Sequence, residues 1–164
     1  MDQVFLFCLF CETSKEIIVE TFLKNIGMDV ISALVERKVY KHSKWIKEIR
    51  SIIPWYVFFK NNCEPDWNEI CKNKYIYYPL QYSDKCKSLK ENDLLFIKWL
   101  ERYNGRIKIS KAIINGNKIK ILEGPLKDLE GNIVKINKKQ KCASVRIEGE
   151  GIKNTIWLSY EIIG

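Results

Sequence analysis

The spacing of apolar positions changes along the N-terminal part of the chain, and each spacing predicts a different element. Val4–Cys11 is an unbroken apolar run, typical of a strand that is buried on both faces. Residues 13–26 then carry apolar side chains at helical spacing. A Thr13-x-x-Glu16 capping box precedes them and Gly27 follows them, so we expect a helix that begins and ends there.

The next stretch predicts a hairpin and a further strand. Val30–Tyr40 alternates loosely, Lys41–Lys44 is a polar turn, and Trp45–Ile49 forms the returning strand. Pro54 interrupts the pattern. The aromatic and β-branched run Trp55–Lys60 is typical of a strand.

Helices and strands continue to alternate as far as residue 105. Pro65 opens a short helix, and residues 75–82 form an aromatic strand. Asn92 or Asp93 caps a second long helix that ends near Tyr103. The order β-α-β-β-β-α-β-α indicates an α+β sandwich, an antiparallel sheet flanked by helices, and not a doubly wound parallel sheet.

The pattern after Gly105 contains strands and turns without a predicted helix. Asn115-Gly116 is the strongest hairpin signal in the chain. Short strands without helices predict a small C-terminal β-barrel. We therefore expect a first domain over 1–104, a linker over 105–114 and a second domain over 115–164. The strands that we expect in this region span 107–114, 118–122, 131–136, 142–147 and 155–158.

The composition and net charge of the chain bear on the kind of partner it binds. The chain has 164 residues, of which 46% are hydrophobic, so packed cores can form. A net charge of +8 favours a polyanionic partner, with a solvated lysine surface as the alternative. No apolar run is long enough for a membrane helix. Because Asp2 and Glu12 flank the first apolar run, we expect a cytoplasmic protein and no secretion signal.

The residues that carry most enzyme chemistry do not form a recognisable pattern. No Ser or Cys has a visible base near it, and no glycine-rich phosphate loop is present. Cys8-x-x-Cys11 is the only CxxC pair, and His42 is the only histidine, so a zinc site lacks ligands. We expect six buried hydrophobic cysteines, no metal or other cofactor, and no enzymatic activity.

Two basic stretches and one aromatic stretch are the candidate binding surfaces. Basic residues dominate Arg37–Arg50, where contact with nucleic acid and a solvated surface are equally consistent with the sequence. Lys135–Arg146 holds no acidic residue, which favours contact with phosphates. The run Ile52–Phe59 is too apolar to be buried easily on both faces, so it contributes either core or a protein-binding concavity.

Read together, these stretches resemble the NusG family of transcription elongation factors. The segment Ile121–Ile136, with Gly131 at its centre, resembles the KOW motif. Pro54-Trp55-Tyr56-Val57 resembles the Pro-Gly-Tyr-Val strand of the NusG N-terminal domain, with Trp55 in place of glycine. That replacement requires a different start of the strand or an outward-facing Trp55.

The tail is similar to that of the LoaP antiterminators, which are specialised members of this family. The similarity lies in Gly124-Pro125-Leu126, in Lys135-Ile136-Asn137, in the basic tetrapeptide Lys138–Lys141 and in Ala143. The resemblance implies a bacterial cytoplasmic monomer with a NusG N-terminal (NGN) domain and a KOW barrel. It implies docking on the clamp helices of RNA polymerase and recognition of an RNA hairpin in an operon leader, with non-template DNA as a further possible contact.

The expected function is therefore processive antitermination of transcription. The alternative is a general NusG-like elongation regulator whose KOW domain binds a protein and not RNA. For polymerase, the candidate residues are Phe5, Ile53, Tyr56 and Phe58. For RNA, they are Lys41, Lys44, Arg106, Lys127, Lys135, Asn137, Lys138, Lys139, Lys141 and Arg146.

Overall fold

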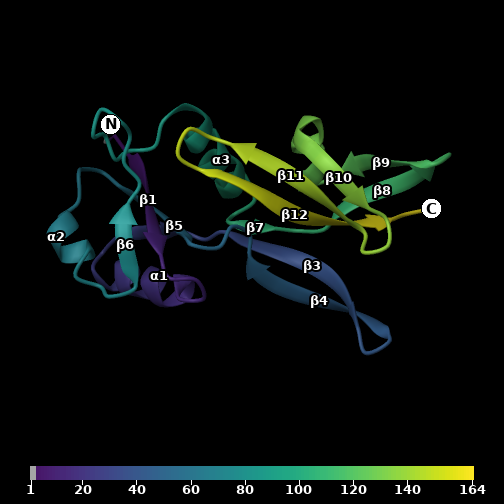
Figure 1. Ribbon diagram of the computed structural model, residues 1–164, viewed down its shortest axis with the longest axis horizontal. Coiled ribbons are helices and arrows are strands. Elements are labelled where there is room, and N and C mark those ends of the chain that lie inside the picture. Colours follow the sequence, from purple (N-terminus) through teal and green to yellow (C-terminus); the bar gives the residue numbers. More distant parts are fainter. Residues whose placement is uncertain (1–2) are drawn as a thin grey trace. The chain divides into compact units, whose positions relative to one another are not determined.

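The computed structural model describes residues 3–164, and the described chain forms two compact units (Figure 1). Unit 1 contains the chain up to Ala33, Ile53–Gly105 and Gly149–Ile152. Unit 2 contains Leu34–Ile52, Arg106–Glu148 and Lys153–Gly164. Neither unit is one continuous segment. The chain passes from one unit to the other after Ala33, Ile52, Gly105, Glu148 and Ile152. The division into domains over 1–104 and 115–164 stays a prediction.

Unit 1 is built around a four-stranded antiparallel sheet in the order β2-β5-β1-β6. Its strands are β1 (Phe5–Cys11), β2 (Asp29–Ile31), β5 (Tyr56–Asn61) and β6 (Ile76–Pro79). The apolar strand β1 lies inside the sheet, paired with β5 on one edge and with β6 on the other. Both rows of its backbone polar groups therefore find partners, as the unbroken apolar run predicted.

Helices cover both faces of this sheet. Phe7, Leu9 and Phe59 belong to one core cluster with residues of α1 (Glu16–Asn25) and α2 (Trp67–Ile70). On the opposite face, Phe58 of β5 packs edge-on against Phe96 of α3 (Glu91–Arg102), with ring centroids 6.2 Å apart. Burial of each such side chain contributes about 1.5–3 kcal/mol. The predicted α+β class is confirmed for this unit.

The helix starts differ from the sequence prediction. The N-cap of α1 is Lys15, without a side-chain cap, so the capping box at Thr13 is wrong. The carboxylate of Glu16 instead accepts a hydrogen bond from the backbone N–H of Trp55 at 3.1 Å. In α3, Asp93 is not the cap but lies in the first turn. Both carboxylates serve tertiary contacts that outweigh local capping.

Unit 2 contains the hairpin of β3 (Leu34–Lys41) and β4 (Lys44–Ser51). The short strand β7 (Arg106–Ile107) pairs with β3 in parallel. The single strand predicted over Val30–Tyr40 is thus two strands. The chain changes partner at Ser32–Ala33, because β2 pairs with β5 whereas β3 pairs with β4 and β7.

The rest of unit 2 is a five-stranded sheet in the order β10-β11-β12-β8-β9. Every ladder is antiparallel except β12 with β8. Among residues 3–164 no ladder joins β9 to β10, so a closed barrel remains a prediction. The strands are β8 (Ser110–Asn115), β9 (Lys118–Glu123), β10 (Ile133–Asn137), β11 (Cys142–Glu148) and β12 (Lys153–Ile162).

Two short helical turns interrupt the predicted all-β tail. They are α4 (Pro125–Asp128) and a 3-10 turn (Glu130–Asn132), and both lie inside the KOW-like segment between β9 and β10. Pro125 occupies the first position of α4, where its missing N–H costs nothing. Leu126 of this helix is fully buried, so α4 adds to the core of unit 2.

No helix in the described part of the chain, residues 3–164, is both long and apolar enough to cross a membrane.

The two glycines of the KOW-like segment should respond differently to alanine. Gly124 has φ of +108°, and a Cβ there would lie 2.7 Å from Ser110 Oγ. A Cβ at Gly131 would meet no atom within 4 Å, and the φ of Gly131 is not left-handed. We expect Gly124→Ala to lower the free energy of unfolding by roughly 2 kcal/mol or more, through backbone strain and the close contact.

Gly131→Ala is the matched control and should change stability by less than about 0.5 kcal/mol. Urea denaturation followed by circular dichroism measures both variants. Equal losses at the two positions would contradict the close packing of Gly124 on Ser110.

Candidate nucleic-acid and protein interfaces

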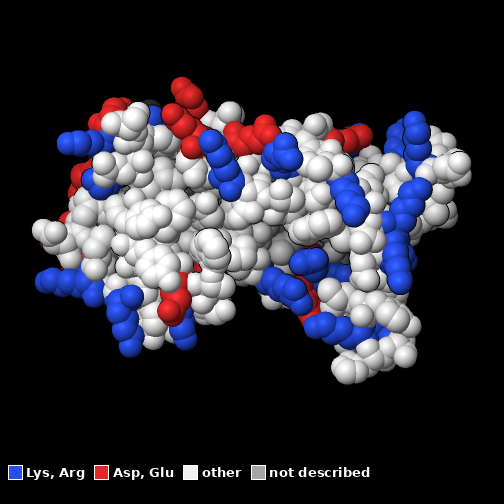
Figure 2. Space-filling model, in the orientation of Figure 1, with Lys and Arg blue, Asp and Glu red and all other residues white. Residues whose placement is uncertain are grey.

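The two basic stretches, far apart in sequence, both belong to unit 2. The first lies on the β3–β4 hairpin, and the second runs along β10, the 138–141 turn and β11. Figure 2 shows Lys and Arg side chains over the hairpin and around the strand ends of this unit. The sequence assigned the hairpin to the first domain, so it did not predict that the two stretches would share a unit.

Several of the predicted RNA-binding residues already have acidic partners. Arg106 Nη2 lies 2.9 Å from Glu36 Oε1, and the Glu36 side chain is buried. The other pairs are exposed, and exposed pairs contribute little to stability. They join Lys41 to Glu48, Lys127 to Glu130 and Arg146 to Glu148.

Glu48 holds two cations of the hairpin at once. The hydrogen bond from Lys41 lowers the pKa of the Glu48 carboxyl, and Arg50 lowers this pKa further. Glu48 therefore stays ionised and reduces the positive charge on its side of the hairpin. A phosphate that approached Lys41 would have to compete with this carboxylate.

The remaining predicted cations have no carboxylate within ion-pair distance in the described chain. Lys138 Nζ donates to the backbone oxygen of Asn117, which places the 138–141 turn beside the turn between β8 and β9. Asn137 accepts a hydrogen bond from the backbone N–H of Gln140 and so shapes the 138–141 turn. The unpaired cations of the predicted set are Lys44, Lys135, Lys138, Lys139 and Lys141.

The predicted polymerase-binding residues are placed unequally in unit 1. Ile53 and Phe58 are fully buried, so neither presents a side chain to a partner. Phe5 is half-buried and packs against the core cluster that contains α1 and α2. Tyr56 alone of the four lies in an accessible aromatic group.

That aromatic group crosses three strands of the sheet. Phe10 of β1 is opposite Tyr56 of β5 and Tyr78 of β6 in the two ladders. Its ring centroid lies 4.8 Å from that of Tyr56 and 4.9 Å from that of Tyr78. Phe10 and Tyr56 are half-buried, and Tyr78 is 57% exposed. We call Phe10, Tyr56 and Tyr78 the aromatic face.

Sequence reasoning missed Phe10 and Tyr78. Residues of β1 point alternately to the two faces of the sheet, and Phe7 and Leu9 belong to the cluster with α1 and α2. Phe10 must therefore lie on the other face, with its ladder partners beside it. Alternation was the available signal, but the unbroken apolar run of β1 hid it.

Trp55 faces outward, which is one of the two alternatives that the sequence left open for a residue in place of glycine. Its side chain is 58% exposed, and its φ is +81°, a left-handed value that favours glycine. Its backbone is held at both ends, since its N–H donates to Glu16 and its carbonyl accepts from the N–H of Cys11. The strand begins with glycine-like geometry although the residue is tryptophan.

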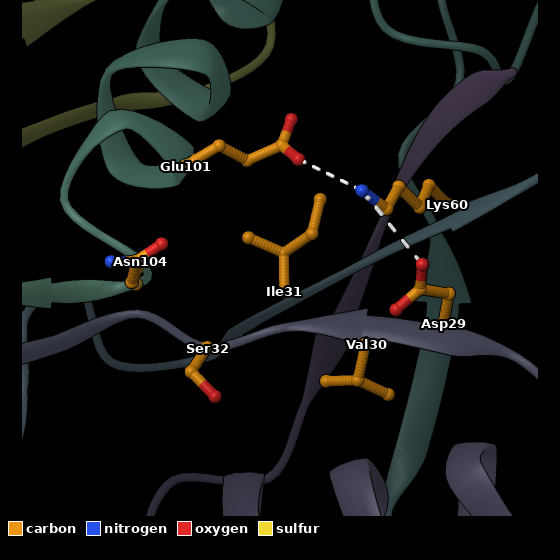
Figure 3. Close-up of a pocket in the computed structure, with 8 residues that line it drawn as sticks. Asp29, Val30, Ile31, Ser32, Lys60, Glu101 and Asn104 are labelled. Atoms are coloured by element: carbon orange, nitrogen blue, oxygen red, sulfur yellow. Dashed lines mark hydrogen bonds and ion pairs between the residues drawn. The ribbon is translucent and has the colours of Figure 1, made fainter.

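A small cavity of about 200 Å³ opens beside β2 in unit 1 (Figure 3). Lys60 Nζ lies 3.0 Å from Glu101 Oε2 and 3.7 Å from Asp29 Oδ2. The hydrogen bond to Glu101 raises the pKa of Lys60, so the ammonium stays charged and paired.

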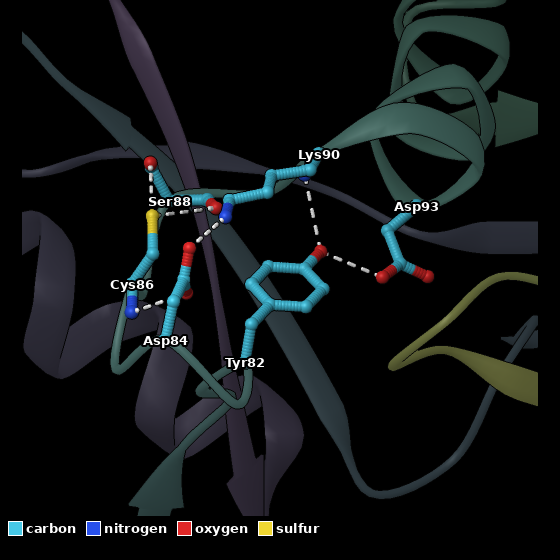
Figure 4. Close-up of polar contacts among 6 residues, drawn as sticks. All are labelled: Tyr82, Asp84, Cys86, Ser88, Lys90 and Asp93. Carbon is cyan, nitrogen blue, oxygen red and sulfur yellow. Dashed lines mark hydrogen bonds and ion pairs between the residues drawn. The ribbon is translucent and has the colours of Figure 1, made fainter.

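A buried carboxylate organises the start of α3 in unit 1 (Figure 4). Asp93 is fully buried and accepts hydrogen bonds from Tyr82 Oη at 2.6 Å and from the N–H groups of Gly151 and Ile152, both at 2.8 Å. Burial and the bond to Asp93 raise the pKa of Tyr82. Gly149 is required beside it, because a Cβ there would collide with the Asp93 carboxylate. The hydrogen bonds to Asp93 hold the start of α3 against Tyr82 and the Gly151–Ile152 backbone.

The cysteines follow the sequence prediction only in part. All six are free thiols. Cys8, Cys11 and Cys142 are buried as predicted, and burial raises the pKa of Cys11 to about 12. Cys63 and Cys71 are exposed, so for them the prediction of burial is wrong. The described residues contain no group of three or more His, Cys, Asp or Glu side chains that could hold a metal ion.

Comparison with solved structures shows a NusG-like fold. The structure titled "Domain interaction in Thermotoga maritima NusG" matches with a TM-score of 0.53 and 15% sequence identity, covering 96% of this chain and 94% of that one. No protein-family model matches the chain. No curated protein matches it either.

The strained tryptophan gives a direct test of the local backbone. Trp55→Gly should raise the free energy of unfolding by up to about 1 kcal/mol, because glycine adopts a left-handed φ without steric cost. Trp55→Ala keeps the Cβ and the strain, and serves as the control. Urea denaturation compares them, and equal stabilisation by alanine would show that the backbone conformation is not the cause.

Proposed function

We propose that this protein is a processive transcription antiterminator that binds RNA polymerase through unit 1 and a hairpin in the nascent RNA through unit 2. The observation that carries the proposal is the NusG-like fold over nearly the whole chain, together with one apolar and one basic surface on different units. The proposed compartment is the cytoplasm, where both partners are found.

The aromatic face supports the polymerase half of the proposal. Three adjacent rings, one of them more than half exposed, provide the kind of uncharged surface that marks protein interfaces. Tyr56 is the contact that the sequence also named. Buried Phe58 and Ile53 would act indirectly, by holding β5 in place beneath it. The clamp helices of the largest subunit are the proposed docking site.

The unpaired lysines of unit 2 support the RNA half. Double-stranded RNA is read through its shape, its phosphates and its 2′-hydroxyls, whereas loops and bulges expose their bases. Lys138, Lys139 and Lys141 share one turn and are free of carboxylates, so they can neutralise phosphates. Arg106 and Arg146 are less suited than the sequence suggested, because each is engaged by a glutamate.

The glutamates that pair with Arg106 and Arg146 are also consistent with the alternative function, a general elongation regulator. If acidic partners cancel much of the charge of unit 2, its KOW-like part would bind a protein in a general elongation regulator. A pull-down with the full chain from nuclease-treated and untreated extract distinguishes the two, because only an RNA-guided factor recovers a specific RNA.

Tyr78→Ala should weaken binding to purified RNA polymerase core enzyme by about tenfold, because a central aromatic contact typically contributes 1–2 kcal/mol or more. Ile17→Ala is the control, since Ile17 is 72% exposed but lies on α1, which covers the opposite face of the sheet. Biolayer interferometry measures both. Equal affinity of Tyr78→Ala and wild type would remove the aromatic face from the interface.

Replacing Lys138, Lys139 and Lys141 together with alanine should weaken binding to hairpin RNA. It should also flatten the slope of log affinity against log salt by roughly two to three units, because each phosphate contact contributes about 0.7–0.9. Fluorescence anisotropy at several salt concentrations gives the slope. An unchanged slope would show that this turn does not contact RNA. Lys111→Ala, which removes an ion-paired lysine of β8, is the control.

A further inference from the structure

An exposed pair of aromatic rings stands at the end of the β3–β4 hairpin. Tyr40 and Trp45 are directly opposite in the ladder, with ring centroids 5.5 Å apart and planes at 62°. Tyr40 is 55% exposed and Trp45 is 40% exposed. A cross-strand aromatic pair stabilises a hairpin by about 0.2–1 kcal/mol, but that contact does not require so much ring surface to face solvent.

The turn that joins these strands is held in an unfavourable conformation. His42 has φ of +52° and Ser43 has φ of +63°, both left-handed. A two-residue turn of this type is normally made by Asn-Gly or Gly-Gly. Backbone strain of this kind is found often at active sites and ligand-binding sites. Here the turn sets Tyr40 opposite Trp45 next to the end of the ladder.

A lysine from the second basic stretch contacts the Trp45 ring. Lys141 Nζ lies 5.2 Å from the centroid of the Trp45 ring. Strand β3 is fixed to β12 within unit 2, because the N–H of Lys38 donates to Ser159 Oγ and Lys38 Nζ pairs with Glu161 at 3.0 Å. The 138–141 turn and the end of the hairpin therefore meet at Trp45.

The two faces of the hairpin differ in available charge. In the ladder, Tyr40 and Trp45 share a face with Lys47, whereas Glu48 and its two cations lie on the other face. Lys47, Lys138, Lys139 and Lys141 have no carboxylate within ion-pair distance among residues 3–164. The aromatic side of the hairpin end therefore carries Lys47 without an acidic partner, whereas on the other side Glu48 pairs two cations and leaves Lys44 unpaired.

Exposed aromatic rings beside lysines that lack an acidic partner suit nucleotides whose bases are not base-paired. Every base offers a flat face that can stack on an aromatic ring, and lysines can neutralise the linking phosphates. An acidic peptide would satisfy the lysines but would leave the rings without stacking partners. A fully paired helix would hide its base faces. The arrangement therefore favours a single-stranded loop.

We propose that Tyr40 and Trp45 stack unpaired loop bases of an RNA hairpin, while Lys47 and the lysines of the 138–141 turn hold the loop phosphates. This assignment rests on the proposed RNA binding and specifies which part of the RNA is read and by which residues. The site is composite, because it needs the end of the β3–β4 hairpin and the β10–β11 turn together.

The test uses the full chain and two probes, an RNA hairpin with an adenosine loop and a blunt duplex of the same stem. Trp45→Ala should weaken binding to the hairpin by about tenfold or more and leave binding to the duplex nearly unchanged. The salt slope should stay the same, because no charge is removed. Trp45→Phe keeps an aromatic plane and should retain most of the affinity.

A fluorescent adenine analogue in the loop reports stacking directly. Its emission should fall when wild-type protein binds and should fall much less with Trp45→Ala. Ile49→Ala is the matched control, since it truncates another exposed apolar side chain of β4 on the same face of the ladder. Thermal unfolding by circular dichroism verifies that each variant is folded.

The outcomes separate this site from the proposed function. Tight hairpin binding that depends on Lys138, Lys139 and Lys141 but not on Trp45 would overturn the stacking site and leave RNA binding intact. Absence of any RNA binding at low salt would overturn both. Equal affinity for a DNA hairpin with the same loop would overturn the assignment to RNA.

Discussion

The burial of β1 on both faces and both edges is the constraint on which unit 1 depends. An all-apolar strand has to be paired on each side and covered above and below, since its backbone groups and its side chains must both leave water. β5 and β6 pair with it, α1 and α2 cover one face, and α3 covers part of the other. Beyond α3, Phe10, Tyr56 and Tyr78 stay partly accessible to solvent. The candidate protein interface is therefore the part of this sheet face that no helix covers.

In unit 2, ion pairing decides which positive charges can serve a partner. Lysines and arginines on the same hairpin differ in their ion pairs, because Lys41 and Arg50 share Glu48 whereas Lys47 has no carboxylate within ion-pair distance among residues 3–164. A long-range pair such as Arg106 with Glu36 is invisible in the local sequence. The surface that remains positive is smaller than the composition suggests, and part of it lies beside the exposed rings, since Lys141 is over Trp45 and Lys47 shares the face of Tyr40 and Trp45. Exposed rings beside unpaired lysines favour single-stranded RNA as the ligand, because its bases can stack on the rings and its phosphates can bind the lysines.

The elements themselves were largely predictable, and the misses have physical causes. Alternation and turn residues located the strands of the tail, because those signals act between near neighbours. The capping box expected at Thr13 and the cap expected at Asp93 failed, and at both places a carboxylate accepts hydrogen bonds from tertiary donors and not from the first turn of the helix. Glu16 serves Trp55, and Asp93 serves Tyr82 and the turn at Gly151. The strand predicted over 30–40 divides because its two halves pair with different strands.

By itself the sequence determined the α+β class, most of the strands and both basic stretches, because periodicity and charge are local properties of the chain. It also left two alternatives for Trp55, an outward side chain or a different start of the strand, because tryptophan stands in place of the glycine of the Pro-Gly-Tyr-Val strand. Only the tertiary structure decided that the two basic stretches share a unit, that Ile53 and Phe58 are buried, and that Lys141 lies over Trp45. Those facts depend on which strands pair across long stretches of chain, and no spacing within one segment encodes that choice.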